Sequence, residues 1–174
     1  ALPAMAQELR LAVRASIEPA NLDYHVDPYT STMLINSFMT DPLVVRAPDG
    51  SFVPGLATGW EISDDAMEFV LTLREGITFQ DGTPFNADAV VLNMEYFKRA
   101  PVQYSKIDKV FDYAEKIDDY TVRFHLTEKY GSFMNDVIWM QFYTERYLKT
   151  NEGGWNGKPN CPNLSMAGPY GLGP

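Results

Sequence analysis

Cysteine, histidine and positive charge are all scarce in this sequence, and each shortage excludes a class of protein. The 174 residues include a single cysteine, Cys161, so the chain cannot form an internal disulfide. Lys and Arg number 14 against 23 Asp and Glu, which gives a net charge of −9. No basic cluster offers the phosphate contacts that nucleic acids need, and the acidic balance disfavours anionic lipid. No apolar run reaches the roughly 18–20 residues of a membrane-spanning helix.

Motifs for catalysis are also absent. The sequence contains no GxSxG, no HExxH, no P-loop and no glycine-rich dinucleotide turn. Of the two histidines, His125 is interpreted as a surface or packing residue. His25 lies near two aspartates, where a metal site and an ordinary polar loop are both open. Asp64-Asp65 and Asp118-Asp119 fit turns, in which aspartate accepts backbone hydrogen bonds. We therefore expect no enzyme, no cofactor and no metal site.

Apolar material is plentiful and its spacing predicts an α+β fold. The chain is 45% hydrophobic and holds 10 Phe, 10 Tyr and 3 Trp, enough for a packed core. Alternating segments predict strands, and apolar residues at helical spacing behind an Asn86 cap predict the clearest helix, which Pro101 ends. The expected strands cover 9–15 and 42–46, the expected hairpins 60–73 and 111–126, and the expected helices 29–39, 87–100 and 131–139. Residues 150–174 are rich in Asn, Gly and Pro and are expected to form a loop.

The N-terminus contains a pattern typical of signal-peptide cleavage. Ala4-Met5-Ala6 has small residues on both sides of one position, as the shallow pockets of the peptidase require. An ordinary alanine-rich start is the alternative. If cleavage occurs near Ala6, the protein is exported, and residues 1–8 are a remnant or tail.

Ordered segments in the first half of the chain resemble one protein family. They resemble the extracellular solute-binding proteins of the oligopeptide/dipeptide/nickel class, family 5, which are the ligand receptors of ABC importers. The order of the segments is specific, and the resemblance extends over residues 9–174. Its segments are Pro42-Leu43-Val44, Pro54-Gly55-Leu56-Ala57, Trp60-Glu61-Ile62-Ser63, 69–76 and 79–90.

The resemblance implies a domain organisation. The family fold has two lobes that close on a ligand, with a smaller domain inserted in the first lobe. Residues 9–40 would begin the main lobe, 41–150 would form the inserted α+β domain, and 151–174 would return as a loop. Gly171-Leu172-Gly173-Pro174 stands where the family carries Gly-Thr-Gly-Pro at the re-entry point. The sequence is therefore expected to be the N-terminal portion of a longer protein, stopping before the second lobe.

The resemblance also suggests where ligand is contacted. In the family, the loop after the first strand, the loop after the Asn86 helix and the stretch after the second short helix approach the ligand. Residues 139–143 are dense in aromatics and could equally be core. No arginine lies clearly in these stretches, so no partner for a ligand carboxylate is evident. The implied contacts are Asp27, Tyr29, Thr30, Met33, Tyr104, Phe142 and Tyr143.

The function that the resemblance implies is solute capture by closure of two lobes, without chemistry. The expected ligand is an oligopeptide or dipeptide, delivered to ABC permease subunits in the membrane by a monomeric periplasmic receptor. Two alternatives stay open. A nickel chelate or another non-peptide solute would use the same fold, and a sensory module would pass a ligand signal to a membrane receptor.

Overall fold

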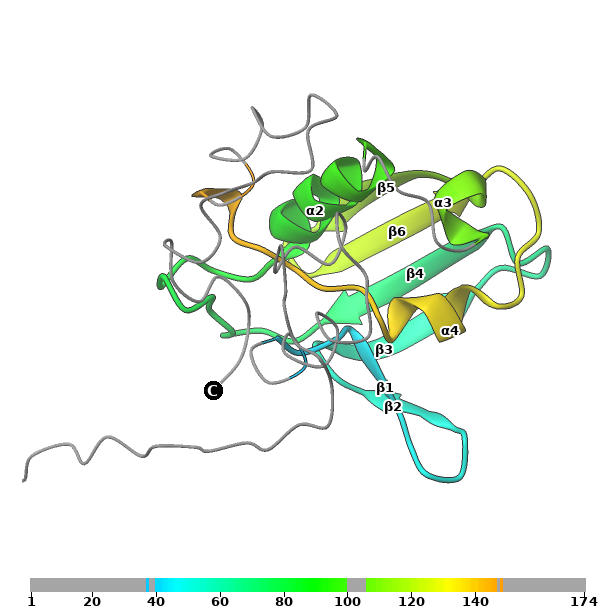
Figure 1. The fold of residues 1–174 in the computed structure, drawn as a ribbon, viewed down its shortest axis with the longest axis horizontal. Helices are drawn as coiled ribbons and strands as arrows, with labels where there is room; N and C mark the ends of the chain where they lie inside the picture. Colours follow the sequence, from blue (N-terminus) through cyan, green and yellow to red (C-terminus); the bar gives the residue numbers. More distant parts are fainter. Residues whose placement is uncertain (1–36, 38–39, 100–105, 147, 149–174) are drawn as a thin grey trace, which may run out of the picture.

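The computed structural model describes residue 37, residues 40–99, residues 106–146 and residue 148 (Figure 1). The strand predicted over 9–15 and the loop predicted over 150–174 lie outside these residues. So does the helix predicted over 29–39, apart from residue 37. The described elements run in the order β1-β2-β3-β4-α2-α3-β5-β6-α4. This mixture of antiparallel strands and helices confirms the predicted α+β class.

The first two strands form a short hairpin that stands apart from the main sheet. β1 (Val44–Arg46) and β2 (Phe52–Pro54) pair antiparallel, with Val45 opposite Val53. Gly50 has a φ of +87°, an angle that glycine adopts without steric cost, so the chain turns tightly at Asp49-Gly50.

Both predicted hairpins are present and join in one four-stranded antiparallel sheet. β3 (Ala57–Ile62) pairs with β4 (Glu68–Leu73), and β5 (Phe111–Asp118) pairs with β6 (Thr121–Leu126). β4 also pairs with β6, so the strand order is β3-β4-β6-β5. The hairpins therefore pair through their second strands. The segment that connects them contains α2, which lies on one face of the sheet.

The alternation of β5 differs from a simple period of two. Register shifts occur between Phe111 and Tyr113 and again between Lys116 and Asp118. Each shift changes which face the next side chain meets. As a result Tyr113 and Ile117 are 47% and 46% exposed, while Ala114 lies opposite Phe124 and packs against the core.

The long helix α2 (Ala87–Arg99) starts and ends as its sequence predicts. The Asn86 side chain accepts a hydrogen bond of 3.0 Å from the backbone N–H of Ala89, which is the expected N-cap. The buried residues of α2 are Ala87, Val90, Asn93, Met94 and Tyr96, whereas the apolar Val91 and Phe97 are only half-buried. The polar Asn93 is the unexpected member of that buried set.

Two short helices complete the described fold. α3 (Ile107–Val110) leads directly into β5. α4 (Phe133–Val137) lies within the predicted helix 131–139 and buries Phe133 and Val137, as predicted. No helix among the described residues combines the length and the apolar character needed to cross a membrane.

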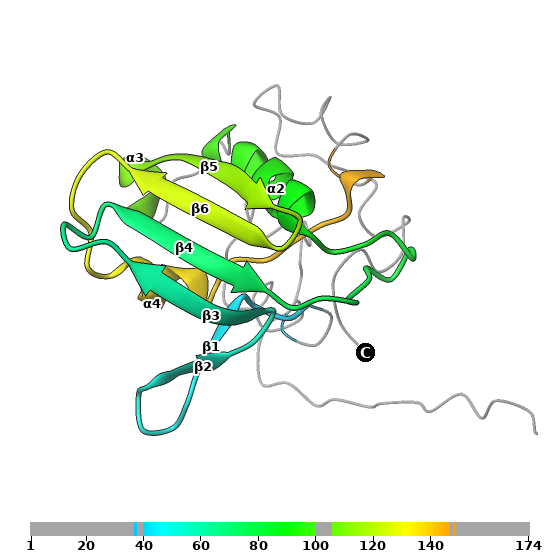
Figure 2. The same cartoon turned by 180° about the vertical axis from the view of Figure 1, so that it is seen from behind.

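The helices α2 and α4 lie on one face of the four-stranded sheet, and the opposite face is the one seen in Figure 2. A single hydrophobic core fills the space between sheet and helices. The ring centroids of Phe69 and Phe133 lie 4.1 Å apart, so α4 packs directly on β4. The largest fully buried side chains of the core are Phe69, Phe85, Phe124, Phe133, Phe142, Leu43, Leu71, Leu73, Val44, Val90, Val122 and Val137.

Candidate functional site

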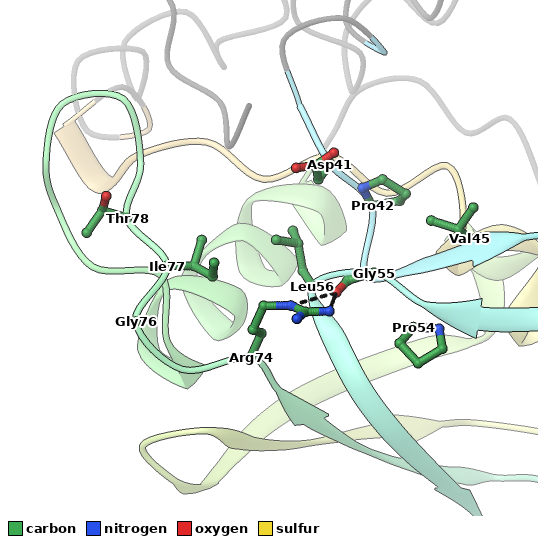
Figure 3. Close-up of a pocket in the computed structure, with 10 residues that line it drawn as sticks. All are labelled: Asp41, Pro42, Val45, Pro54, Gly55, Leu56, Arg74, Gly76, Ile77 and Thr78. Atoms are coloured by element: carbon green, nitrogen blue, oxygen red, sulfur yellow. Dashed lines mark hydrogen bonds between the residues drawn. The ribbon is translucent and has the colours of Figure 1, made fainter. Parts of the chain in front are cut away.

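A cavity of about 510 Å³ lies between the base of the β1–β2 hairpin and the loop that follows β4 (Figure 3). The loop contributes one wall, and the two ends of the hairpin contribute the other. The chain passes this cavity as it leads into β1. The lining residues are Asp41, Pro42, Val45, Pro54, Gly55, Leu56, Arg74, Gly76, Ile77 and Thr78.

The hairpin wall is fixed by close backbone contact. The N–H groups of Gly55 and Ala57 both donate to the carbonyl of Leu43, at 3.2 and 2.8 Å, and Leu56 donates to Pro42 at 3.0 Å. A Cβ atom at Gly55 would lie 2.5 Å from the Pro42 carbonyl oxygen, far inside contact distance. Glycine is therefore required at this position, which explains its place in the signature segment 54–57.

Arg74 is held against the same wall. Its Nε and Nη2 donate to the Gly55 carbonyl oxygen at 3.3 and 3.1 Å, and its backbone N–H donates to Leu56 at 2.7 Å (Figure 3). Asp41 lies beside Pro42, where the chain leads into the hairpin, and Thr78 lies on the loop. An arginine and an aspartate thus face one cavity that is also lined by apolar side chains.

Only two of the residues implied as ligand contacts lie within the described part of the chain. Asp27, Tyr29, Thr30, Met33 and Tyr104 lie outside the described residues. The two that the structure describes, Phe142 and Tyr143, are buried, with 1% and 4% of their surface exposed.

Phe142 and Tyr143 are built into the domain by specific contacts. The Phe142 ring packs edge-on against Phe85, with centroids 5.8 Å apart. The Tyr143 hydroxyl lies 3.2 Å from Oε1 of Gln141. These contacts account for a packing role, and the ligand role of both residues stays a prediction. Neither residue lines the cavity.

Arg74 is the cavity residue that sequence reasoning missed. It stands in the Leu73-Arg74-Glu75-Gly76 part of the signature, which carries the family resemblance and was not among the implied ligand contacts. Arg74 continues the alternation of the strand as a polar position after Leu73, so no local signal set it apart from a solvent-facing residue. Gly76 has a φ of +74°, so the chain turns there, and Arg74 lies directly after the end of β4.

His125 has the packing role predicted for it. Its ring stacks on Tyr113, with centroids 4.2 Å apart and an interplanar angle of 17°. Nε2 lies 3.2 Å from Glu115 and Nδ1 lies 3.5 Å from Glu68. The Arg123 Nη1 donates to the same Glu115 carboxylate at 3.1 Å. These side chains form a polar network across β4, β6 and β5.

The paired aspartates occupy turns, as predicted. Hydrogen bonds from the Ser63 hydroxyl and the Met67 backbone N–H lower the pKa of Asp65. The backbone N–H of Tyr120 donates to Asp118 at 2.8 Å and lowers the pKa of that carboxyl. Within the described part of the chain, no group of His, Cys, Asp and Glu has an arrangement suited to a metal ion. His25 lies outside that part.

Comparison with known proteins points to one family. The family model for bacterial extracellular solute-binding proteins, family 5 Middle, matches residues 51–173. The glutathione-binding protein GsiB of Shigella boydii serotype 4 (strain Sb227) is 38% identical over 90 residues. That match covers 48% of this chain and 17% of the relative. GsiB of Escherichia coli (strain K12) is 39% identical over 87 residues, covering 46% of this chain and 16% of the relative. The chain thus spans less than a fifth of these relatives.

Solved structures show the same fold in larger proteins. AgaA from A. tumefacien R10, in complex with agropinic acid, has a TM-score of 0.71 and 27% identity, covering 90% of this chain and 30% of that one. The dipeptide binding protein from Pseudoalteromonas sp. SM9913, in complex with Met-Leu, has a TM-score of 0.67 and 25% identity, covering 88% and 34%. NikA from Brucella suis, in complex with Fe(III)-EDTA, has a TM-score of 0.65 and 26% identity, covering 74% and 26%.

Proposed function

Since this chain belongs to the bacterial extracellular solute-binding proteins, family 5, we propose that it is part of a receptor that delivers a small solute to an ABC permease. The observation that carries the proposal is the family match over residues 51–173, which includes the whole four-stranded sheet, α2 and most of the cavity lining. The relatives found are named as binding proteins, so we propose capture and release and no catalysed reaction. The receptor acts outside the cytoplasm, after cleavage of a signal peptide near Ala6.

The proposed mechanism is closure of two lobes around the solute. Residues 41–150 are the domain inserted in the first lobe, and residues 9–40 and 151–174 belong to the main lobe. The continuous core of the described residues 40–146 supports a single folding unit between those segments. The chain covers 30% of the AgaA structure, so the rest of the fold would supply the second lobe.

We propose a short peptide as the solute. The curated relatives at 38–39% identity are named for glutathione, which is itself a short peptide. A structure at 25% identity holds the dipeptide Met-Leu. The ligand contacts implied by the resemblance, Asp27 to Met33, Tyr104, Phe142 and Tyr143, are the proposed site.

A metal chelate is the second candidate. The NikA structure, at 26% identity, holds Fe(III)-EDTA, so this fold accommodates a chelated metal. His25 and Met33 are the residues of this chain that such a ligand would use. A sensory module that signals to a membrane receptor is separated from a transporter by its partners, because only the transporter binds permease and ATPase subunits.

Calorimetry on the longer protein to which this chain belongs tests the proposed function. The panel is glutathione, Met-Leu and Ni(II)–histidine, each titrated into protein unfolded and refolded to remove bound ligand. We expect at least one peptide to bind tightly and the nickel complex not to bind. Binding of Ni(II)–histidine alone would replace the peptide with the chelate, and binding of none of the three would count against both.

A further inference from the structure

We propose that the cavity beside Arg74 binds the free carboxylate of an amino acid or short peptide. The ligand class rests on the proposed function, whereas the location rests on the cavity alone. The site shares no residue with the ligand contacts implied by the resemblance. It would be a second site for such a ligand, on the inserted domain.

The size and walls of the cavity suit a small organic ligand. Its volume of about 510 Å³ is within the range of roughly 300–1,000 Å³ in which ligand pockets fall. Five lining residues are apolar and offer a surface for an aliphatic side chain: Pro42, Val45, Pro54, Leu56 and Ile77. Such walls with a few polar groups are the usual composition of a ligand site.

Arg74 is oriented before any ligand arrives. The carbonyl of Gly55 accepts from both Nε and Nη2, and Gly55 is itself fixed by Leu43 and by its close approach to Pro42. A guanidinium carries five N–H donors, so donors on Nη1 and Nη2 stay available. No carboxylate of residues 40–99 or 106–146 forms an ion pair with Arg74. A held guanidinium with spare donors is the group that binds a carboxylate in two-point geometry.

Asp41 supplies the opposite charge in the same cavity (Figure 3). It is exposed and makes no hydrogen bond or ion pair with another residue in the described part of the chain. Its carboxylate would accept from the ammonium group of a zwitterion whose carboxylate lies on Arg74. The same negative charge opposes a phosphate dianion at Arg74, which is why we favour an amino acid or peptide.

The test is an NMR titration of the 174-residue chain with Met-Leu. Three ligands separate the contributions: Met-Leu, its C-terminal amide and its N-acetyl derivative. We expect the amide signals of Leu56, Gly76, Ile77 and Thr78 to shift together with Met-Leu. The C-terminal amide should bind at least tenfold more weakly, because it cannot pair with Arg74. The N-acetyl derivative should bind several-fold more weakly, because it cannot pair with Asp41.

Variants assign these losses to the two residues. Arg74→Gln should reduce the affinity for Met-Leu at least tenfold. Asp41→Asn should reduce it several-fold and leave the affinity for the N-acetyl derivative unchanged. Arg99→Gln is the matched control, since Arg99 lies at the end of α2, where it pairs with Glu95 at 3.8 Å. It should bind Met-Leu as the unchanged chain does.

Three results would overturn the inference: no shifts at the cavity, equal affinity for the acid and its amide, or undiminished binding by Arg74→Gln. Because Arg74 also holds Gly55, its variant could lose the fold, which the dispersion of the spectrum reveals. In that case the comparison of acid with amide on the unchanged chain decides alone. If the longer protein binds peptide by calorimetry while the cavity does not respond, only the cavity proposal fails.

Discussion

The side chain of Asn93 and the backbone of Tyr143 are joined by two hydrogen bonds of 2.8 Å. Nδ2 of Asn93 donates to the Tyr143 carbonyl, and Oδ1 accepts from the Tyr143 N–H. Nδ2 also donates to the Ala89 carbonyl within α2 at 2.8 Å. The carboxamide nitrogen thus donates two hydrogen bonds and the oxygen accepts one. Asn93 is 1% exposed, and the two residues are 50 apart in sequence. The pair therefore fastens the segment after α4 to the long helix.

Asn93→Ala should lower the free energy of unfolding by about 2–4 kcal/mol. The variant removes both hydrogen bonds between the Asn93 side chain and the buried backbone of Tyr143. Loss of a partner for a buried polar group costs about 1–3 kcal/mol. Urea denaturation of the 174-residue chain measures the change. Asn135→Ala is the control, because Asn135 bonds Arg46 in an exposed setting. It should cost about 0.5 kcal/mol or less, and equal losses in the two variants would contradict the role given to Asn93.

Gly55→Ala should be destabilising by about 1–3 kcal/mol or more. The added Cβ meets the carbonyl oxygens of Pro42 at 2.5 Å and Leu43 at 3.0 Å, and both are backbone atoms that cannot move aside cheaply. Gly59→Ala is the matched control in the next strand, because nothing lies within 4 Å of its added Cβ. Thermal unfolding should show a clear loss for the first variant and almost none for the second.

Asp136 should make the domain less stable as pH rises. Burial raises the pKa of its carboxyl above the ordinary 3.8, a hydrogen bond from Tyr130 partly offsets this, and Oδ2 is buried without a hydrogen-bond partner. A raised pKa means that the stabilising contribution is complete below pH 3.8 and is lost as pH rises through the folded-state pKa. Asp136→Asn should therefore gain stability relative to the unchanged chain as pH increases, which urea denaturation between pH 4.5 and about 8 measures.

Asp118→Asn should show the opposite dependence of stability on pH. The Tyr120 N–H lowers the pKa of Asp118, so its contribution is present above the ordinary 3.8 and is lost as pH falls through the folded-state pKa. The variant should be less stable than the unchanged chain at neutral pH, with the difference shrinking on acidification. If both variants showed the same trend with pH, the contrast drawn between the two carboxyls would be wrong.

Phe142→Ala distinguishes a core residue from a ligand wall. A ring that is 1% exposed and packed on Phe85 should cost about 3–5 kcal/mol when removed. Trp139→Ala is the control from the same aromatic segment, since Trp139 is 51% exposed and should change stability by about 0.5 kcal/mol at most. A small loss for Phe142→Ala would favour the ligand-wall interpretation instead.

Most of the described fold could be predicted from the sequence because its signals are local. Alternation over 67–73 and 120–126 predicted β4 and β6, and the cap at Asn86 predicted the start of α2. The outward positions of Tyr113 and Ile117 could not be predicted, because they depend on register shifts against β6. The pairing of β4 with β6 could not be predicted either, because it joins two hairpins that are distant in the sequence.

The candidate site was predicted less well than the fold. The burial of Asn93 was not predicted, because its partner Tyr143 lies 50 residues away in the sequence. Arg74 was not predicted as a site residue, because only the fold brings it beside Gly55 and into the same cavity as Asp41. Family resemblance indicated the class of protein, but the groups that meet in a cavity come from segments whose proximity no local pattern records.

Mass spectrometry of the longer protein, purified from its own cells under native conditions, tests the central claim most directly. A receptor that closes on its solute retains it through purification, so the bound molecule reports the function without a choice of ligand panel. We predict a short peptide, released on denaturation and identified by its fragments. A bound metal chelate, or protein that is fully occupied by any non-peptide solute, would contradict the account.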